Sequence, residues 1–166
     1  LGDKYSVLCT LDDAGEVVEE SRIRTTSAGV AGRFEHLSAC RVVLEAGTHS
    51  PWVSRQIESY GHQVIVANPR RVALIYGDHT KSDEIDAKTL AKLGRMDPEL
   101  LSPIRHRGAE TLADRAFLTA RTALVRSRAR LIQVARGIVK SHGQRLPACG
   151  AKCFAGKVRG NLPAEL

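Results

Sequence analysis

The sequence has no long hydrophobic run, few aromatic residues and only four cysteines among 166 residues. No apolar stretch approaches the roughly 18 consecutive residues that suggest a membrane-spanning helix. Cys9, Cys40, Cys149 and Cys153 are too scattered for a disulfide framework, so we expect reduced thiols and a cytosolic protein. The last two cysteines, with His142 nearby, lack the second close ligand pair of a zinc site. Without low-complexity tracts, the chain should fold around one core.

The first and last residues of the sequence suggest that it is part of a longer protein. Residues 1–4 are neither a signal peptide nor an initiator methionine. Residues 160–166 resemble a turn that leads into further structure. We therefore expect the chain to be a fragment.

Positive charge is concentrated in one segment. The net charge is +7, and residues 105–145 hold ten basic and two acidic residues, which leaves fifteen basic and sixteen acidic residues elsewhere. Arginine dominates this segment, and its planar guanidinium matches the geometry of phosphate oxygens. A membrane-surface helix is the alternative, but it would need the aromatic anchors that are nearly absent here. The segment predicts a nucleic-acid partner, DNA or RNA, contacted by Arg121, Arg128 and Arg136.

Hydrophobic patterning predicts an α/β domain over residues 1–96. Runs of strand-forming residues predict strands at 5–11, 16–25, 41–46 and 62–67, the first two joined by a turn at 12–15. The third run is apolar at consecutive positions, which is typical of a strand buried on both faces. Helices are predicted at 28–37, 50–60, 70–76 and 83–95. Thr26-Ser27 is expected to cap the first, Ser50 the second and Ser82 the last. A strand pair followed by strand–helix–strand alternation indicates a sheet flanked by helices.

A long helix is predicted from residue 109 to residue 141. Phe117, Leu124, Leu131 and Ile138 recur every seven residues, with small or apolar residues at the matching d positions. This stripe predicts a packing seam for a partner helix or a second copy, with the arginines outside it. The predicted organisation is a catalytic domain at 1–96, a connector at 97–108, a basic coiled-coil arm at 109–145 and the start of a linker at 146–166.

Three acidic residues indicate a metal site. Glu45 closes a buried strand, and the carboxyl ends of strands in open α/β sheets are where ligands collect. Asp83 and Asp86 are three residues apart at a helix start, so they share one face. Such oxygen ligands suit Mg²⁺ or Mn²⁺. The alternative is that Glu45 pairs with a nearby arginine, Arg41 or Arg55, and that the aspartates oppose the helix dipole.

Five further residues are weaker candidates. His49 could assist proton transfer. The favoured interpretation is that it is a loop residue without a catalytic role. Trp52 is most simply a core residue, but it could stack a base if exposed. Arg70 and Arg71 at a helix start could bind backbone phosphate or be solvated arginines of a turn. Lys81 could neutralise a phosphate, or it could be an ordinary solvent-exposed residue that keeps its loop hydrated.

The sequence resembles the N-terminal domain of DEDD transposases of bacterial insertion sequences, of the insertion-sequence-110 type, which include the Piv-like DNA invertases. The resemblance covers nearly the whole chain, and it is carried by residues 1–6, 44–53, 66–71 and 81–87. It implies a fold like that of ribonuclease H and the junction resolvase RuvC, with four acids that bind Mg²⁺. Glu45, Asp83 and Asp86 match the second, third and fourth of these acids.

The departure from the family pattern is the first acid, which the resemblance places on an opening strand immediately before Leu1. Asp3 is a poor substitute, because three residues along a strand displace it by about 10 Å and turn it to the other face. We therefore expect this chain alone to bind metal weakly or not at all and to be inactive. The resemblance also implies a C-terminal domain with a nucleophilic serine, and RNA guidance of target choice in some members.

These features predict a fragment of a bacterial DNA transposase or recombinase, associated with the nucleoid. Glu45, Asp83 and Asp86 would hold Mg²⁺ at the DNA strand to be cut and rejoined. The long helix would align two or four subunits. Two alternatives stay open, a RuvC-like junction nuclease and a nucleic-acid-binding regulator without catalysis.

Overall fold

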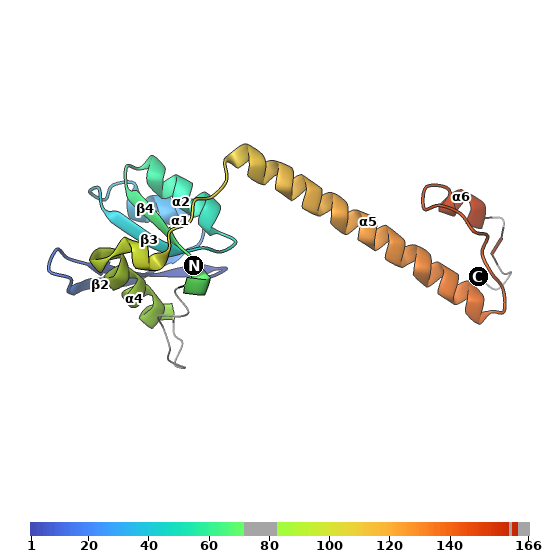
Figure 1. Ribbon diagram of the computed structural model, residues 1–166, viewed down its shortest axis with the longest axis horizontal. Coiled ribbons are helices and arrows are strands. Elements are labelled where there is room, and N and C mark those ends of the chain that lie inside the picture. Colours follow the sequence, from blue (N-terminus) through green and yellow to red (C-terminus); the bar gives the residue numbers. More distant parts are fainter. Residues whose placement is uncertain (72–82, 160, 163–166) are drawn as a thin grey trace. The chain divides into compact units, whose positions relative to one another are not determined.

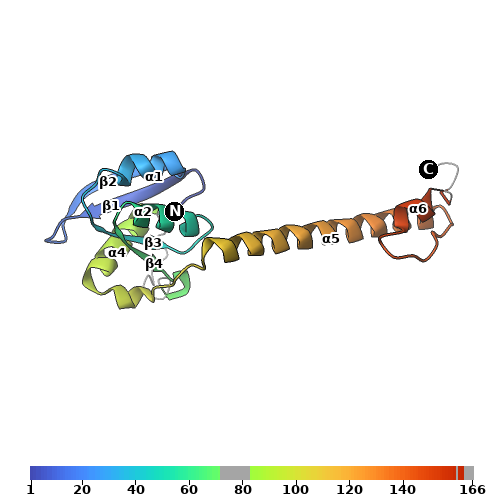
Figure 2. The same ribbon diagram turned by 90° about the horizontal axis from the view of Figure 1, so that it is seen from above.

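The computed structural model describes residues 1–71, 83–159 and 161–162. For Asp83 it describes the backbone but not the side chain. It divides the chain into two compact units, Leu1–His106 and Arg107–Leu166. The first unit contains strands and helices, and the second is helical (Figures 1 and 2). The mixed α/β class is therefore confirmed.

The first unit begins with a β-hairpin. Strand β1 (Tyr5–Leu11) pairs with β2 (Val17–Arg24) in antiparallel register, from Tyr5 opposite Arg24 to Leu11 opposite Val17. Gly15 in the connecting turn has φ +90°, a conformation that glycine adopts without strain. The predicted hairpin is confirmed.

A second pair of strands follows, with parallel direction. Strand β3 (Arg41–Glu45) pairs with β4 (Gln63–Ala67), so that Glu45 lies opposite Ala67 at the carboxyl end of both strands. In the described residues β1 and β3 are not paired, so the strands form two two-stranded sheets. The expectation of one mixed sheet is wrong in this respect, because a cavity lies between the facing edges of β1 and β3.

Helices cover both faces of the strands. Helix α1 (Ser27–Phe34) and helix α2 (Ser50–Ser59) enclose one core cluster with β3 and β4, centred on Leu44 and Val66. Helix α4 (Asp83–Met96) and the short 3₁₀ helix η1 (Pro98–Leu101) enclose a second cluster on the opposite side, which includes Ile65 and Val43. Successive residues of a strand point to opposite faces, so the consecutive apolar residues of β3 and β4 serve both clusters. The prediction that β3 is covered on both faces is confirmed.

One predicted helix cap is confirmed and another is wrong. Thr26 caps α1, because its side chain accepts a hydrogen bond from the backbone N–H of Gly29. The N-cap of α2 is His49, and Ser50 is the first helical residue. The Ser50 hydroxyl is instead bonded backward to Gly47: it donates to the carbonyl oxygen (2.8 Å) and accepts from the N–H (2.9 Å). Ser50 thus fixes the loop after Glu45 and not the helix end.

Residues 97–106, predicted as part of a connector, pack against the first unit. Leu101 is completely buried, and its carbonyl oxygen accepts a hydrogen bond from the N–H of Asn68. The N–H of Ile104 donates to the carbonyl oxygen of Val66 at 2.9 Å. This segment therefore lies alongside the end of β4 and is hydrogen-bonded to it.

The second unit is dominated by helix α5 (Ala109–Ser141), whose bounds are those predicted. Helix α6 (Phe154–Val158) follows it. The heptad residues Phe117, Leu124 and Leu131 are 73%, 72% and 69% exposed. In the described residues no helix is long and apolar enough to cross a membrane.

Candidate functional site

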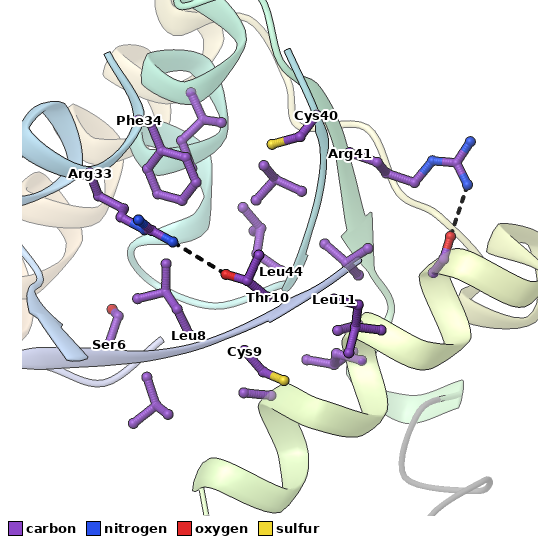
Figure 3. A pocket seen from close by; sticks show the side chains of 18 of the residues that line it. Ser6, Leu8, Cys9, Thr10, Leu11, Arg33, Phe34, Cys40, Arg41 and Leu44 are labelled. Atoms are coloured by element: carbon purple, nitrogen blue, oxygen red, sulfur yellow. Dashed lines mark hydrogen bonds between the residues drawn. The ribbon is translucent and has the colours of Figure 1, made fainter. Parts of the chain in front are cut away.

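A cavity of about 730 Å³ lies in the first unit (Figure 3). Its walls are formed by β1, β3, α1 and α4. Leu8 and Phe34 lie on the α1 side, whereas Cys9 lies beside α4. Both Glu45 and Asp86, which are far apart in the sequence, line this cavity.

The fold determines where the Glu45 carboxylate lies. Glu45 is the last residue of β3 and is half-buried. It forms no ion pair within the described residues, whereas the nearby Arg41 donates to the side-chain oxygen of Gln63 (2.9 Å) and the carbonyl of Gly94 (3.0 Å). The pairing of Glu45 with Arg41 or Arg55 is therefore not formed. Glu45 is available to a ligand at the sheet edge.

Helix α4 supplies the second carboxylate. Asp86 lies in its first turn and is half-buried at the cavity wall. The backbone of Asp83 begins the same helix, and its side chain lies outside the described residues. The described side chains contain no group of three or more histidine, cysteine or acidic residues that could hold a metal ion. The structure thus brings two of the three predicted ligands to one cavity, and the prediction for Asp83 stays untested.

His49 and Trp52 are engaged with each other. The indole N–H of Trp52 donates to Nδ1 of His49 at 3.2 Å, and Nε2 of His49 lies 3.6 Å from the Asp3 carboxylate. Trp52 is half-buried against the α1–α2 core cluster. His49 therefore contacts Trp52 and Asp3, and Trp52 packs against the core, as favoured by the sequence.

Comparison with known proteins decides the family. A family profile described as "Transposase", the DEDD transposase of the insertion-sequence-110 type, matches residues 1–143. The chain belongs to this transposase family. It is also 29% identical over 134 residues, 80% of the chain, to a Sinorhizobium fredii protein named "Putative transposase y4qE". The chain spans about a third (33%) of the length of that relative.

In this transposase family member, the predicted nucleic-acid contacts lie in different environments. Arg70 and Arg71 are exposed in a helical turn after β4, and the N–H of Arg70 donates to the Asn68 side chain at 3.1 Å. Arg121 and Arg128 are exposed on α5. Lys81 lies outside the described residues.

Arg136, the last of these predicted contacts, is engaged by its own chain. Its guanidinium donates to the carbonyl oxygens of Pro147 and Cys149 at 3.5 Å and lies 5.6 Å from the centre of the Phe154 ring. These contacts hold the segment after α5 against the helix. Arg136 therefore contributes to packing within the second unit, and its contact with nucleic acid stays a prediction.

Two polar residues near the cavity, His106 and Arg33, were not predicted from the sequence. Nε2 of His106 lies 2.9 Å from the Ser50 hydroxyl, so a residue 56 positions away supports the loop after Glu45. Arg33 lines the cavity, where it donates to Thr10 at 3.3 Å and forms an ion pair with Glu19 at 2.6 Å. No spacing in the sequence signals either contact, because both depend on how the chain packs.

Two cysteines also line the cavity. Burial raises the pKa of the Cys9 thiol, with a further contribution from the nearby Glu20 carboxylate. Burial also raises the pKa of the Cys40 thiol, against an opposing effect of the Arg33 guanidinium. Both thiols are therefore kept neutral and are poor nucleophiles.

Proposed function

We propose that the chain is the N-terminal part of a DNA transposase that cuts and rejoins DNA strands with the help of Mg²⁺ or Mn²⁺. The observation that carries this proposal is the position of Glu45 and Asp86 on the wall of one cavity. One acid comes from a strand end and the other from the first turn of a helix, which are the positions where ligands collect in α/β sheets. Membership of the transposase family supplies the reaction class.

The residues present fit a hard divalent cation. Glu45 and Asp86 offer carboxylate oxygens, the ligands that Mg²⁺ and Mn²⁺ prefer, and both are half-buried. Asp83 would add a third carboxylate from the same helix face. When bound, the metal would stabilise the charge that develops on the attacking and leaving oxygens of the DNA phosphate. The residues of the chain would orient it, with Ser50 and His106 holding the loop beside Glu45.

The finer features belong to the same proposal. A ribonuclease H-like fold would be completed by an opening strand that carries the first acid ahead of Leu1. The exposed stripe of Phe117, Leu124 and Leu131 would pair α5 with a second copy, an arrangement that the heptad spacing favours. Arg121 and Arg128, exposed on the same helix, would contact DNA or a guide RNA.

The test compares acids of the cavity with an acid outside it. In the full-length protein, Glu45→Gln and Asp86→Asn should each reduce recombination of a plasmid substrate by at least about a hundredfold, because each removes a charged metal ligand. Glu84→Gln is the matched control, since Glu84 lies in the same helical turn but is exposed and does not line the cavity. Circular dichroism of each variant should be unchanged. Full recombination by Asp86→Asn would refute the metal role of Asp86.

The same assay separates the alternative functions. A junction nuclease would give cut products without rejoined ones. A regulator without catalysis would bind DNA fully without divalent metal and would be indifferent to Glu45→Gln. We expect rejoined products that depend on both metal and Glu45.

A further inference from the structure

The open end of the β1–β2 hairpin carries an arginine that is stacked on an aromatic ring. The guanidinium carbon of Arg22 lies 4.0 Å from the centre of the Tyr5 ring. Both side chains are exposed, and so is that of Arg24, which lies directly opposite Tyr5 in the strand register. Stacking holds the guanidinium plane in one orientation, so less conformational entropy is lost when its donors bind a ligand. Tyr5, Arg22 and Arg24 are called the hairpin site below.

The hairpin site lies on a single face of the two strands. Residues opposite each other in an antiparallel pair point to the same face, and so do alternate residues along each strand. Tyr5 and Arg24 form one such pair, and Arg22 belongs to the next pair on that face. Ile23, between the two arginines, points the other way and packs against the α1–α2 core cluster. Cys9, on the same face as the hairpin site, lies beside α4 (Figure 3). The site is therefore turned away from the α1–α2 core.

The backbone beneath the hairpin site is fixed by several hydrogen bonds. The N–H of Thr25 donates to the carbonyl oxygen of Lys4 at 3.0 Å, which closes the end of the hairpin. The Thr25 hydroxyl donates to the carbonyl oxygen of Gly2 at 2.9 Å and lies 2.8 Å from the Ser6 hydroxyl. Thr25 and Ser6 are both buried. Exposed side chains on such a backbone suit a binding site, because little of the protein has to be ordered when a ligand binds.

The positive charge of the hairpin site is not neutralised by the protein. Within the described residues, neither Arg22 nor Arg24 forms an ion pair or a side-chain hydrogen bond. Glu20, the acid of β2 on the same face, lies opposite Cys9 and pairs with neither arginine. Surface arginines are often simply solvated, but a solvated arginine needs neither a ring beneath it nor a fixed backbone. Two arginines without acidic partners favour an anionic ligand, and planar guanidinium groups match the oxygens of a phosphate.

The hairpin site lies next to the edge of the first unit that carries Glu45. Asp3, two residues before Tyr5, lies 3.6 Å from His49 in the loop that follows Glu45. An open hollow of about 290 Å³ adjoins the site, and it is lined by Asp3, Lys4, Tyr5, Arg24, Thr25 and Thr26. Lys4 and Arg24 give this hollow a positive charge that its one acid does not cancel. A phosphate-bearing ligand on the hairpin site would therefore extend toward the Glu45 loop.

We propose that the hairpin site binds the phosphate backbone of a single DNA strand. Arg22, already oriented by Tyr5, would donate paired N–H groups to one phosphate. Arg24 lies two residues along the strand, about 7 Å away, a spacing at which it can hold the neighbouring phosphate over the hollow. That this strand continues to the phosphate that is cut rests on the proposed function, whereas its binding does not. The hairpin site belongs to the first unit and adds a contact that α5 does not provide.

Arginine footprinting tests the site in the unaltered full-length protein, without divalent metal so that no strand is cut. The probe is a single-stranded oligodeoxythymidine of about twelve nucleotides, within the range of known single-strand binding sites. Modification of each arginine by phenylglyoxal is followed by mass spectrometry. We expect the probe to slow modification of Arg22 and Arg24 about fivefold or more, because phosphate oxygens occupy their donors. Arg55, exposed on α2 with the α1–α2 core cluster beneath it, is the reference and should react at an unchanged rate. Equal protection of Arg55, or no protection of Arg22, would overturn the proposal.

Substitutions then measure how much each arginine contributes. Arg22→Gln and Arg24→Gln should each weaken binding of the probe about fivefold at ~0.1 M salt. Each should also reduce the slope of log affinity against log salt concentration by about 0.7, the value for one phosphate contact on a single strand. Arg55→Gln is the matched control, because it makes the same charge change outside the site, and it should leave the slope unchanged. Arg22→Lys should keep the slope but lose affinity, since an ammonium group lacks the planar fork. A slope that Arg22→Gln leaves unchanged would contradict the phosphate contact.

Two other polymers test the identity of the occupant in the same footprinting assay. Polyglutamate at an equal concentration of charge should protect Arg22 much less than the oligodeoxythymidine. Equal protection would assign the site to an acidic protein segment and would overturn the proposal. Oligouridine that protects Arg22 more strongly than the DNA probe would assign the site to RNA and would also overturn it. The Glu45→Gln variant should show the same footprint as the unaltered protein while its recombination is lost, so the two proposals can fail separately.

Discussion

Gly94 in α4 lies against β3 so closely that a methyl group does not fit. A Cβ atom built on Gly94 would overlap Cγ2 of Val43, and it would lie 3.7 Å from Leu101. Alanine normally stabilises a helix interior relative to glycine by about 0.5–1 kcal/mol. Overpacking a filled core costs about 1–3 kcal/mol. Because Val43 is β-branched and has few alternative rotamers, we expect the cost to exceed the gain and Gly94→Ala to lower the free energy of unfolding by about 1–2 kcal/mol.

Gly32 in α1 provides the matched control in the same unit. A Cβ atom there would meet nothing within 4 Å, so Gly32→Ala should raise the free energy of unfolding by about 0.5–1 kcal/mol. The assay is urea denaturation followed by fluorescence of Trp52, the one tryptophan of the chain, which packs on the core of the first unit. The two variants should therefore move the urea midpoint in opposite directions.

A double-mutant cycle identifies the cause. Val43→Ala in the Gly94→Ala background should restore stability relative to the sum of the single changes, with a coupling of about 0.5–3 kcal/mol, the range found for residues in contact. If Gly94→Ala proves as stable as Gly32→Ala, or if the coupling with Val43→Ala is zero, the close packing of α4 on β3 is refuted.

Three further predictions concern a cap, a helix surface and a thiol. Thr26→Ala should lower the free energy of unfolding by about 1 kcal/mol in the same urea assay, because the Thr26 hydroxyl caps α1. Thr26→Ser keeps the hydroxyl and should retain most of the stability of the unchanged protein. Leu124→Asp should shift the chain toward monomer in sedimentation equilibrium, because it places a charge in the apolar stripe of α5. Thr122→Asp, on the opposite side of α5, should leave the association unchanged. The same degree of association in both variants would count against pairing through this stripe. The raised pKa of Cys40 stabilises the fold below the pKa of the unfolded thiol, and this contribution is lost as pH rises through the folded pKa. Its alkylation should accordingly reach half-maximal rate at a higher pH in the folded chain than in urea, and identical pH profiles would contradict the desolvation of this thiol.

The sequence predicted elements whose signals are local. The seven-residue recurrence of apolar residues predicted the long helix α5, and the threonine before α1 marked its cap. Ser50 misled because serine followed by proline usually begins a helix, while its hydroxyl here bonds backward to Gly47. The single sheet was mispredicted for another reason. Which strand edges meet depends on all the strands present, and that information is not contained in any one strand.

The candidate site was predictable to the same extent. Glu45 was found because the residue at a strand end has a defined place at the sheet edge, and Asp86 because helical spacing defines a face. Arg33 and His106 could not be found, since they reach the site through contacts across 23 and 56 positions. Arg136 was predicted to contact nucleic acid from its charge, and its contacts with Pro147 and Cys149 could not be predicted from the sequence.

Helix α5 has 33 residues, which at about 1.5 Å per residue gives a rod of about 50 Å. Stacked base pairs advance about 3.4 Å each, so a rod of this length reaches along roughly fifteen of them, or nearly one and a half turns of a duplex. A straight rod cannot follow a groove through such a rotation. In the proposed complex with DNA, the exposed arginines of α5 would therefore meet the sugar–phosphate backbone only where it crosses the helix, and the length of the helix would fix how far apart those crossings can lie.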